Sequence, residues 1–233
     1  MFQQDVIVLA GATGRVGGAT LRKLTDEGAR VVVVSRKERD MGDAQAVVAD
    51  LADPAATQAL VDDVVRRFGR IDAVVNLAGR GKFVALADST LADLRTNLDG
   101  FVVTAYNLSL AALRAMLRQD YRFERRSRGH IVTVTAGSSK DPQPRFGLFG
   151  AAKAGVNTLM RAIAREHKAD GIVANAVVLG GVATDAAREY LTKEEFDAAA
   201  SPEEVANVLA FLASPASDGI NGELIDLNAR EVD

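Results

Sequence analysis

Apolar residues along this chain form two kinds of pattern that alternate from one end to the other. Short continuous runs rich in valine and isoleucine predict buried strands, and stretches with apolar residues at helical spacing separate them. The runs cover residues 6–9, 30–34, 45–49, 71–75, 130–135, 172–179 and 223–227. This alternation predicts an α/β fold, a doubly wound parallel sheet of about seven strands with helices on both faces.

The stretches between the runs carry typical signals of helix ends. Gly28 ends the first helical pattern, Pro54 lies in the first turn of the second, and Ser201 begins the last as a capping residue. One apolar face repeats at helical spacing over residues 91–108, which predicts a long helix. A further helix is predicted over residues 150–167.

Three glycines follow the first apolar run. Gly11, Gly14 and Gly17 lie between that predicted strand and the helical pattern after it. Glycines at such a turn let the backbone approach a pyrophosphate, and the helix that follows offers free N–H groups at its N-terminus. The strand, turn and helix together therefore predict a dinucleotide site, whereas the glycines alone would indicate only a tight turn.

Composition excludes several classes of function. The chain has 233 residues without a visible repeat or linker, so residues 1–233 are predicted to form one domain. Its formal charge of −3 predicts no nucleic-acid partner, and the basic segment 118–128 is interpreted as a solvated helix end and loop rather than a phosphate contact. No uncharged apolar run reaches the length of a membrane span, and residues 1–5 resemble no signal peptide. With no cysteine and two histidines, no metal site is predicted, and a cytoplasmic protein is expected.

The glycine-rich segment resembles the short-chain dehydrogenase/reductase family, although Ala10 and Arg15 depart from that family's T-G-x-x-x-G-x-G. Three further segments match the family in the expected order. They are Asn76-Leu77-Ala78-Gly79, the stretch Asn175 to Thr184 (N-A-V-V-L-G-G-V-A-T) and the predicted helix Ser201 to Ser214. The resemblance covers essentially the whole chain and implies a nicotinamide dinucleotide cofactor.

The resemblance also implies which residues contact that cofactor. The second strand ends at Ser35-Arg36-Lys37, with two cations and no carboxylate to repel a 2′-phosphate, so NADP(H) is predicted to be preferred over NAD(H). The implied cofactor-binding residues are Gly11, Thr13, Gly14, Arg15, Val16, Gly17, Arg36, Asp50, Leu51, Asn76, Ala78, Gly79, Lys153, Gly180, Val182 and Thr184.

The catalytic positions match the family only in part. The family uses Y-x-x-x-K, in which the lysine lowers the pKa of the tyrosine four residues before it on the same helical face. Here Lys153 is present, but Phe149 replaces the tyrosine and Ala136 replaces the serine. Loss of a positioned acid typically lowers the rate about 10²- to 10⁴-fold.

Three other residues near these positions are candidates for a catalytic role. Asn97 matches the asparagine of the family's catalytic helix, where it would either cap a kink or orient a water molecule. Ser138 and Tyr190 are possible substitutes for the missing serine and acid. A polar loop residue and a lid residue are the favoured interpretations of these two.

Two functions stay open from the sequence. The first is an NADP(H)-dependent oxidoreductase that transfers a hydride to a small carbonyl- or imine-type substrate. The second is a dinucleotide-binding regulatory or partner protein, or a non-redox enzyme that reuses the same pocket. Small residues at Gly150, Ala151, Ala154 and Gly155 permit close contact either with another copy or with the chain's own sheet. The resemblance, whose members commonly pair this helix and the long one across a two-fold axis, implies a homodimer or homotetramer.

Overall fold

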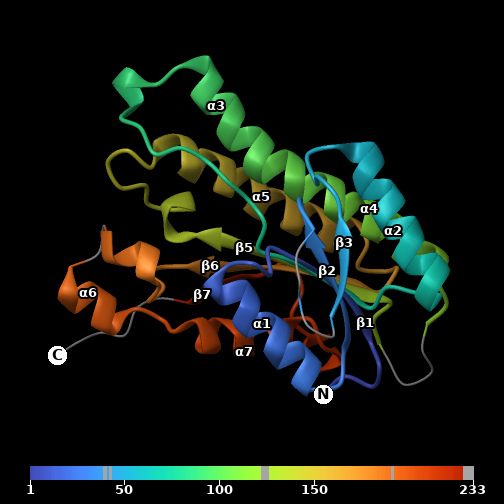
Figure 1. Ribbon diagram of the computed structural model, residues 1–233. Coiled ribbons are helices and arrows are strands. Elements are labelled where there is room, and N and C mark those ends of the chain that lie inside the picture. The colour runs from blue at the N-terminus through green and yellow to red at the C-terminus, as the bar shows by residue number, and fades with distance from the viewer. Residues whose placement is uncertain (39–40, 42–43, 122–125, 190–191, 228–233) are drawn as a thin grey trace.

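The computed structural model (Figure 1) describes residues 1–38, 41, 44–121, 126–189 and 192–227. Seven parallel strands form one sheet in the order β3-β2-β1-β4-β5-β6-β7, which confirms the predicted fold class. The strands are β1 Val6–Ala10, β2 Arg30–Ser35, β3 Gln45–Val48, β4 Ala73–Asn76, β5 Gly129–Ala136, β6 Ile172–Leu179 and β7 Leu224–Leu227. Most are buried on both faces, which explains their continuous apolar runs.

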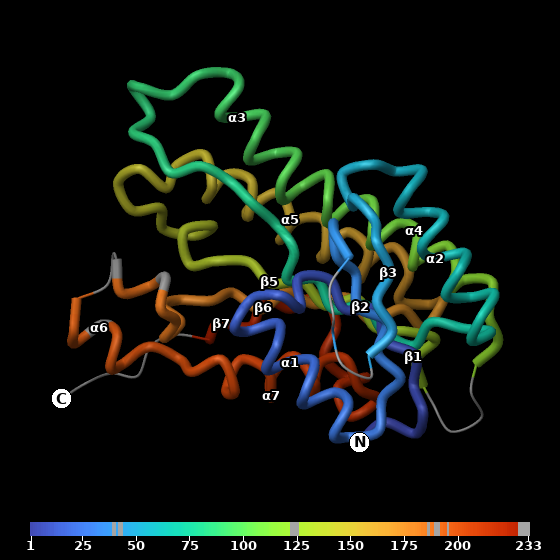
Figure 2. The backbone as a smooth tube through the Cα atoms, in the orientation of Figure 1, coloured from blue at the N-terminus to red at the C-terminus, as the bar shows by residue number. Residues whose placement is uncertain are grey.

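Helices cover both faces of this sheet. The α-helices are α1 Arg15–Asp26, α2 Pro54–Phe68, α3 Leu91–Asn97, α4 Thr104–Arg118, α5 Gly147–Glu166, α6 Lys193–Ala198 and α7 Pro202–Leu212. One apolar core joins the sheet to α2, α4 and α5, and a second joins its other face to α1 and α7. Figure 2 shows the chain leaving the sheet before α3 and returning along α4.

The starts of α5 and β4 differ from the predicted boundaries by two or three residues. Helix α5 begins at Gly147, three residues before the predicted start, because the chain already turns at Phe146. The fourth strand begins at Ala73 rather than Ile71. Asp72 is buried there and accepts a hydrogen bond of 2.9 Å from the backbone N–H of Val6, which joins the amino end of this strand to β1.

The long predicted helix is continuous from Leu91 to Arg118, but it is not uniform. Helices α3 and α4 are joined by a π-helical segment, η2, at Leu98–Val103. Among the described helices, this one is long and apolar enough by composition to cross a membrane, with a mean hydropathy of 1.4 over its most apolar window. Of that window 56% is buried inside the protein, as in the core helix of a water-soluble domain, so the membrane evidence is weak.

Candidate functional site

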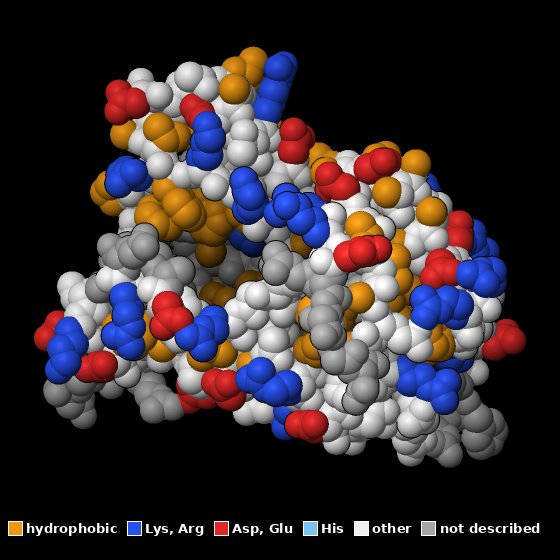
Figure 3. Space-filling model, in the orientation of Figure 1, with side chains coloured by type: hydrophobic (Ala, Val, Ile, Leu, Met, Phe, Trp, Pro, Cys, Tyr) orange, Lys and Arg blue, Asp and Glu red, His pale blue; other side chains and the backbone are white. Residues whose placement is uncertain are grey.

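The carboxyl ends of the strands define one functional edge of the sheet. The strand order reverses between β1 and β4, and in doubly wound sheets ligands bind in the crevice outside the carboxyl ends at such a point. Figure 3 shows a hollow in this face of the molecule with an apolar patch beside it. In the same orientation, Figure 1 has α3 and α5 on one side of this region and α6 on the other.

The three glycines of the first turn differ in the space that a side chain would have at each position. Gly11 has a φ of +88°, and a Cβ there would lie 2.7 Å from the carbonyl carbon of Leu77. A Cβ at Gly17 would overlap the carbonyl oxygen of Gly11 and lie 2.7 Å from the Cα of Ala12. A Cβ at Gly14 would meet nothing nearer than 3.8 Å. The fold therefore requires Gly11 and Gly17, whereas Gly14 leaves space that a ligand can use.

The N-terminus of α1 is open to an anion. Gly14 occupies its N-cap position, and no side chain among the described residues accepts a hydrogen bond from the first turn of the helix. That turn contains Arg15 and Val16 but no acidic residue, and Thr13 precedes it as an exposed residue. Free N–H groups at a helix start bind phosphate groups well.

The turn after β4 lies against the glycine turn. The backbone N–H of Leu77 donates to the carbonyl of Ala10 at 2.9 Å, next to Gly11. Asn76 is buried, and its Oδ1 accepts from the N–H of Ala78 at 3.0 Å, which fixes the turn. The predicted residues Asn76, Ala78 and Gly79 are thus brought to the same edge as the first turn.

Gly79 continues toward the long helix, where close packing depends on further glycines. A Cβ at Gly79 would overlap the ring of Phe101, and a Cβ at Gly100 would overlap the carbonyl oxygen of Arg80. The segment after β4 therefore lies directly against the π-helical segment η2.

Asp50 and Leu51, expected near the adenine ring, follow β3. Asp50 is exposed, and its Oδ1 accepts from the N–H of Ala52 at 3.0 Å. Leu51 is buried, and its carbonyl oxygen accepts from Nδ2 of Asn107 on α4 at 2.9 Å. Asn107 thus anchors this loop to the helix layer, a contact between distant residues that the sequence did not indicate.

The predicted phosphate-binding arginines differ in their surroundings. Arg36 is exposed just after β2 and makes no ion pair within the part of the chain that the structure describes. Arg15 donates to the carboxylate of Asp185 in the segment after β6, and this contact holds the pKa of Asp185 below its usual value. Both partners are exposed, so this pair is weak.

The loop after β6 reaches the same edge through this contact. The N–H of Gly180 donates to the carbonyl of Leu227 at 3.0 Å, and Val182 pairs with Ala200 in a parallel bridge. The N–H of Thr184 donates to the carbonyl of Val182 at 2.8 Å, immediately before Asp185. The three predicted residues of this loop therefore lie on a segment tied to the N-terminus of α1.

Lys153 lies inside the protein, with a relative exposure of 9%. Its Nζ donates to the carbonyl oxygen of Val134 on β5 at 2.9 Å. The same atom lies 4.4 Å from the ring centre of Phe101 and 5.8 Å from that of Phe149. Burial disfavours the charged form and lowers the pKa of Lys153 to about 8.

Phe149 belongs to a cluster of four aromatic rings, here called the phenylalanine cluster, made of Phe83, Phe101, Phe146 and Phe149. The ring centres of neighbouring members lie between 4.5 Å and 6.0 Å apart, mostly in edge-on arrangements. Phe83 is 48% exposed, and Phe146 and Phe149 are partly exposed. Phe83 and Phe146 lie in irregular segments, so no periodic pattern predicted the cluster.

Ala136 ends β5 and is followed at once by a 3₁₀ turn, η3 Gly137–Ser139. The Oγ of Ser138 is buried and has no hydrogen-bond partner in the described structure. Ser139 instead accepts from Nδ2 of Asn157 on α5 at 2.8 Å. Tyr190, the other possible substitute, lies outside the described residues.

Asn97 is fully buried at the last position of α3, where the π-helical segment begins. Its Nδ2 donates to the carbonyl oxygens of Asp93 at 3.0 Å and Lys82 at 3.3 Å. Its Oδ1 is buried without a hydrogen-bond partner in the described part of the chain. A π-helical segment often marks a functional site, and Asn97 lies at the start of this one.

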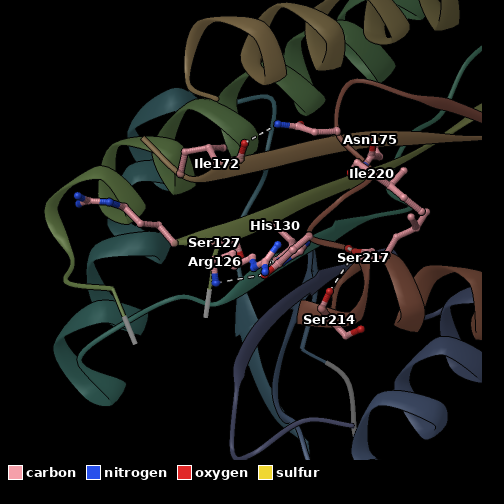
Figure 4. A network of polar contacts seen from close by, with 12 residues as sticks. Arg126, Ser127, His130, Ile172, Asn175, Ser214, Ser217 and Ile220 are labelled. Atoms are coloured by element: carbon pink, nitrogen blue, oxygen red, sulfur yellow. Dashed lines mark hydrogen bonds and ion pairs between the residues drawn. The ribbon is translucent and has the colours of Figure 1, made fainter. Parts of the chain in front are cut away.

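A second polar network, shown in Figure 4, lies at the amino end of β5. Ser127 Oγ donates to Asp218 Oδ1 at 2.6 Å, and both groups contact Nε2 of buried His130. Burial acts to raise the pKa of Asp218, but the hydrogen bonds from His130 and Ser127 outweigh it, so this pKa is lowered. A catalytic triad needs the serine and the carboxylate on different ring nitrogens, so this network joins segments rather than activating a nucleophile.

The described residues contain no group of three or more histidine, aspartate or glutamate side chains that could hold a metal ion.

Comparisons with known proteins cover nearly the whole chain. Residues 11–229 match the protein family described as enoyl-(acyl carrier protein) reductase. The chain is 33% identical to a (5R,7aS)-5-hydroxy-7a-methyl-1-oxo-2,3,5,6,7,7a-hexahydro-1H-indene-carboxyl-CoA reductase of Mycobacterium tuberculosis, over 97% of this chain and 92% of that protein. It is 27% identical to a short-chain type dehydrogenase/reductase of Picea abies, over 97% and 92%. The crystal structure of gox2181 is similar with a TM-score of 0.85 at 28% identity, over 98% of this chain and 95% of that one.

Proposed function

The chain belongs to the short-chain dehydrogenase/reductase family, and on that premise we propose that it is an NADP(H)-dependent oxidoreductase that transfers a hydride to a small carbonyl- or imine-type substrate. A nicotinamide dinucleotide is the cofactor that membership of this family implies. The proposal is carried by two features of one side of the sheet, the glycine turn after β1 and the buried Lys153, whose Nζ donates to Val134 near the carboxyl end of β5.

The residues at the first turn fit a dinucleotide. The space beside Gly14 and the uncapped N-terminus of α1 suit a pyrophosphate. Arg36, exposed at the end of β2, suits a 2′-phosphate, and this supports NADP(H) over NAD(H). Arg15 can add a second contact when it releases Asp185.

Lys153 and the phenylalanine cluster supply the other end of the crevice. The ammonium of Lys153 has three N–H groups, and Val134 accepts from one of them. The other two can donate to the ribose hydroxyls of the cofactor. When bound, the nicotinamide supplies the hydride. The partly exposed rings of Phe83, Phe146 and Phe149 exclude water and suit a substrate with an apolar surface.

The replacement of the family's tyrosine by Phe149 favours substrates whose reduction does not need a proton from a phenol. Phe149 has no proton to donate, and Ala136 has no hydroxyl to hold a carbonyl oxygen. An iminium already carries the positive charge that draws the hydride, so its reduction does not need the missing acid. A reactive small carbonyl is the other substrate type proposed.

The same replacement supports the alternative function, a dinucleotide-binding regulatory or partner protein or a non-redox enzyme. The experiment that separates the two is a titration of dialysed protein with NADPH and NADH, followed by a panel of carbonyl and imine substrates. Tight NADPH binding with cofactor oxidation supports the oxidoreductase. Binding without oxidation across the panel contradicts it and supports the alternative.

We also propose a homodimer or homotetramer in the cytoplasm. Gly150 packs against the backbone of Ser138 within its own domain, but Ala151 and Gly155 lie on the exposed side of α5. Tyr106 on the neighbouring long helix is 48% exposed, and such a combination of small and aromatic residues suits close contact between copies. A monomeric mass by light scattering at micromolar concentration would contradict this assembly.

A further inference from the structure

Lys153 is a buried cation without an acidic partner among the described residues. Its recorded polar contact is the carbonyl oxygen of Val134, and the rings of Phe101 and Phe149 lie beside its Nζ. Buried lysines are rare unless they are paired, because removing an unpaired charge from water is costly. Such an arrangement at the carboxyl edge of the sheet indicates a chemical role.

We propose that Lys153 itself donates the proton that the substrate oxygen gains when a carbonyl is reduced, in place of the phenol that Phe149 lacks. The inference rests on the proposed hydride-transfer function. It assigns Lys153 a direct catalytic role in addition to its contact with the cofactor.

The geometry leaves protons free for this purpose. An ammonium group has three N–H donors, and one of them is directed at Val134 on β5. The remaining two can contact a ribose hydroxyl and a substrate oxygen at the same time. Phe149 precedes Lys153 by four residues on α5, so both side chains lie on one helical face. A substrate oxygen that approaches the edge of the Phe149 ring is thereby brought toward Nζ.

Other described polar groups nearby are less suited to this task. Both protons on Nδ2 of Asn97 are donated to backbone carbonyls, and an amide is not an acid near neutral pH. Ser138 has a buried hydroxyl without the neighbouring base that would be needed to make it a proton carrier. Burial lowers the pKa of Lys153 to about 8, close to the range in which a general acid works best.

The step balances in atoms and charge. The carbonyl carbon gains a hydride from the bound nicotinamide, and the electron pair of the C=O π bond moves to the oxygen. That oxygen takes one proton from the ammonium of Lys153, which becomes a neutral amine and regains a proton from solvent. The products are an alcohol and the oxidised cofactor.

Charged groups on the elements that pack against α5 do not account for the lowered pKa of Lys153. Its pKa is lowered by burial, with no contribution from a neighbouring charge. The described charged or titratable groups on those elements are Asp93 and Arg95 on α3, Asp99 in η2, Tyr106, Arg114 and Arg118 on α4, His130 on β5, and Lys140 directly after η3.

The test compares Lys153→Arg with the wild type, because arginine keeps the positive charge but cannot release a proton near neutral pH. We expect NADPH affinity, measured by fluorescence, to change less than about threefold. We expect the rate of carbonyl reduction to fall about 100-fold. The wild-type rate should fall above pH 8 as the ammonium loses its proton, and the variant should show no such fall. Lys140→Arg is the matched control, and it should behave as the wild type.

A measurement on the wild type keeps the inference falsifiable if Lys153→Arg folds poorly. The ¹⁵N chemical shift of the Lys153 Nζ, followed by NMR, reports its pKa without turnover, and a midpoint above pH 10 overturns the inference. In a Phe149→Tyr background a phenol supplies the proton, so Lys153→Arg should then lower the rate of carbonyl reduction only a few fold.

The outcomes separate the two proposals. A Lys153→Arg variant that retains the wild-type rate and pH profile overturns the role of Lys153, and Tyr190→Phe then tests the other donor. If neither the wild type nor Phe149→Tyr with Ala136→Ser oxidises NADPH although both bind it, the proposed oxidoreductase function itself is overturned.

Discussion

The two ends of the crevice differ in what fixes their residues. At the glycine turn, Gly11 and Gly17 are required by backbone packing, whether or not a cofactor binds. At helix α5, Phe149 belongs to an aromatic cluster, while Lys153 is buried without an acidic partner among the described residues, which costs free energy. Residues that the fold requires say little about ligands. The functional information lies in the residues that packing does not require, namely Gly14 and Lys153.

The largest expected effect tests the first half of this comparison. Gly17→Ala would place a Cβ against the carbonyl of Gly11, so the turn must shift. We expect a loss of about 3 kcal/mol in unfolding free energy, roughly 10 °C in Tm, and a loss of NADPH binding. Thermal unfolding and fluorescence titration measure both.

Gly14→Ala is the matched control at the same turn. Its Cβ would meet nothing nearer than 3.8 Å, so we expect only the loss of about 1 kcal/mol that alanine costs at an N-cap, and a much smaller fall in Tm than in Gly17→Ala. NADPH affinity should nevertheless fall about 10-fold, because the methyl group occupies space proposed for the pyrophosphate. Unchanged NADPH affinity in this variant would show that the pyrophosphate does not bind at the N-terminus of α1.

Lys153→Met tests the cost of the buried cation. The lowered pKa, from 10.5 to about 8, corresponds to about 3 kcal/mol, partly offset by the lost contacts to Val134 and Phe101. We therefore expect the variant to be about 2 kcal/mol more stable at pH 7. Between pH 8 and 10.5 the unfolded chain binds the proton more tightly, so wild-type stability rises and the difference shrinks.

Denaturant unfolding at pH 7 and pH 10 measures this difference. Lys140→Met replaces an exposed lysine that pairs with Asp226 and should show no such gain. A Lys153→Met variant that is less stable than the wild type at pH 7 would mean that the lysine is a structural residue.

Phe149→Tyr with Ala136→Ser tests the second half of the comparison. The phenol and hydroxyl should raise the rate of carbonyl reduction about 30-fold, less than the full effect of a general acid because we propose that Lys153 already donates a proton. Phe211→Tyr adds the same oxygen to an exposed ring on α7, outside the phenylalanine cluster, and should leave the rate unchanged. A rate in the double variant equal to that of the wild type would show that the missing groups do not limit the reaction.

The sequence predicted all seven strands and the main helices, because buried parallel strands are continuous apolar runs and helix ends carry local signals. It did not predict the π-helical segment η2, within which Gly100 packs against the backbone of Arg80. The contact of Arg15 with Asp185 joins residues 170 positions apart, and no local pattern encodes it. The same holds for the phenylalanine cluster, whose members come from a loop, a helix junction and the start of α5.

The smallest expected effect concerns cofactor preference. Arg36→Ala should weaken NADPH binding about 10-fold and NADH binding less than twofold, because only NADPH has a 2′-phosphate for a charged hydrogen bond. Arg15→Ala should weaken NADPH binding less, about threefold, since Arg15 must first release Asp185. Fluorescence titrations at low and high salt measure these changes, and both should shrink as salt screens the charges. Equal losses for the two cofactors in Arg36→Ala would mean that Arg36 does not recognise the 2′-phosphate. The preference for NADP(H) would then have to arise elsewhere in the crevice.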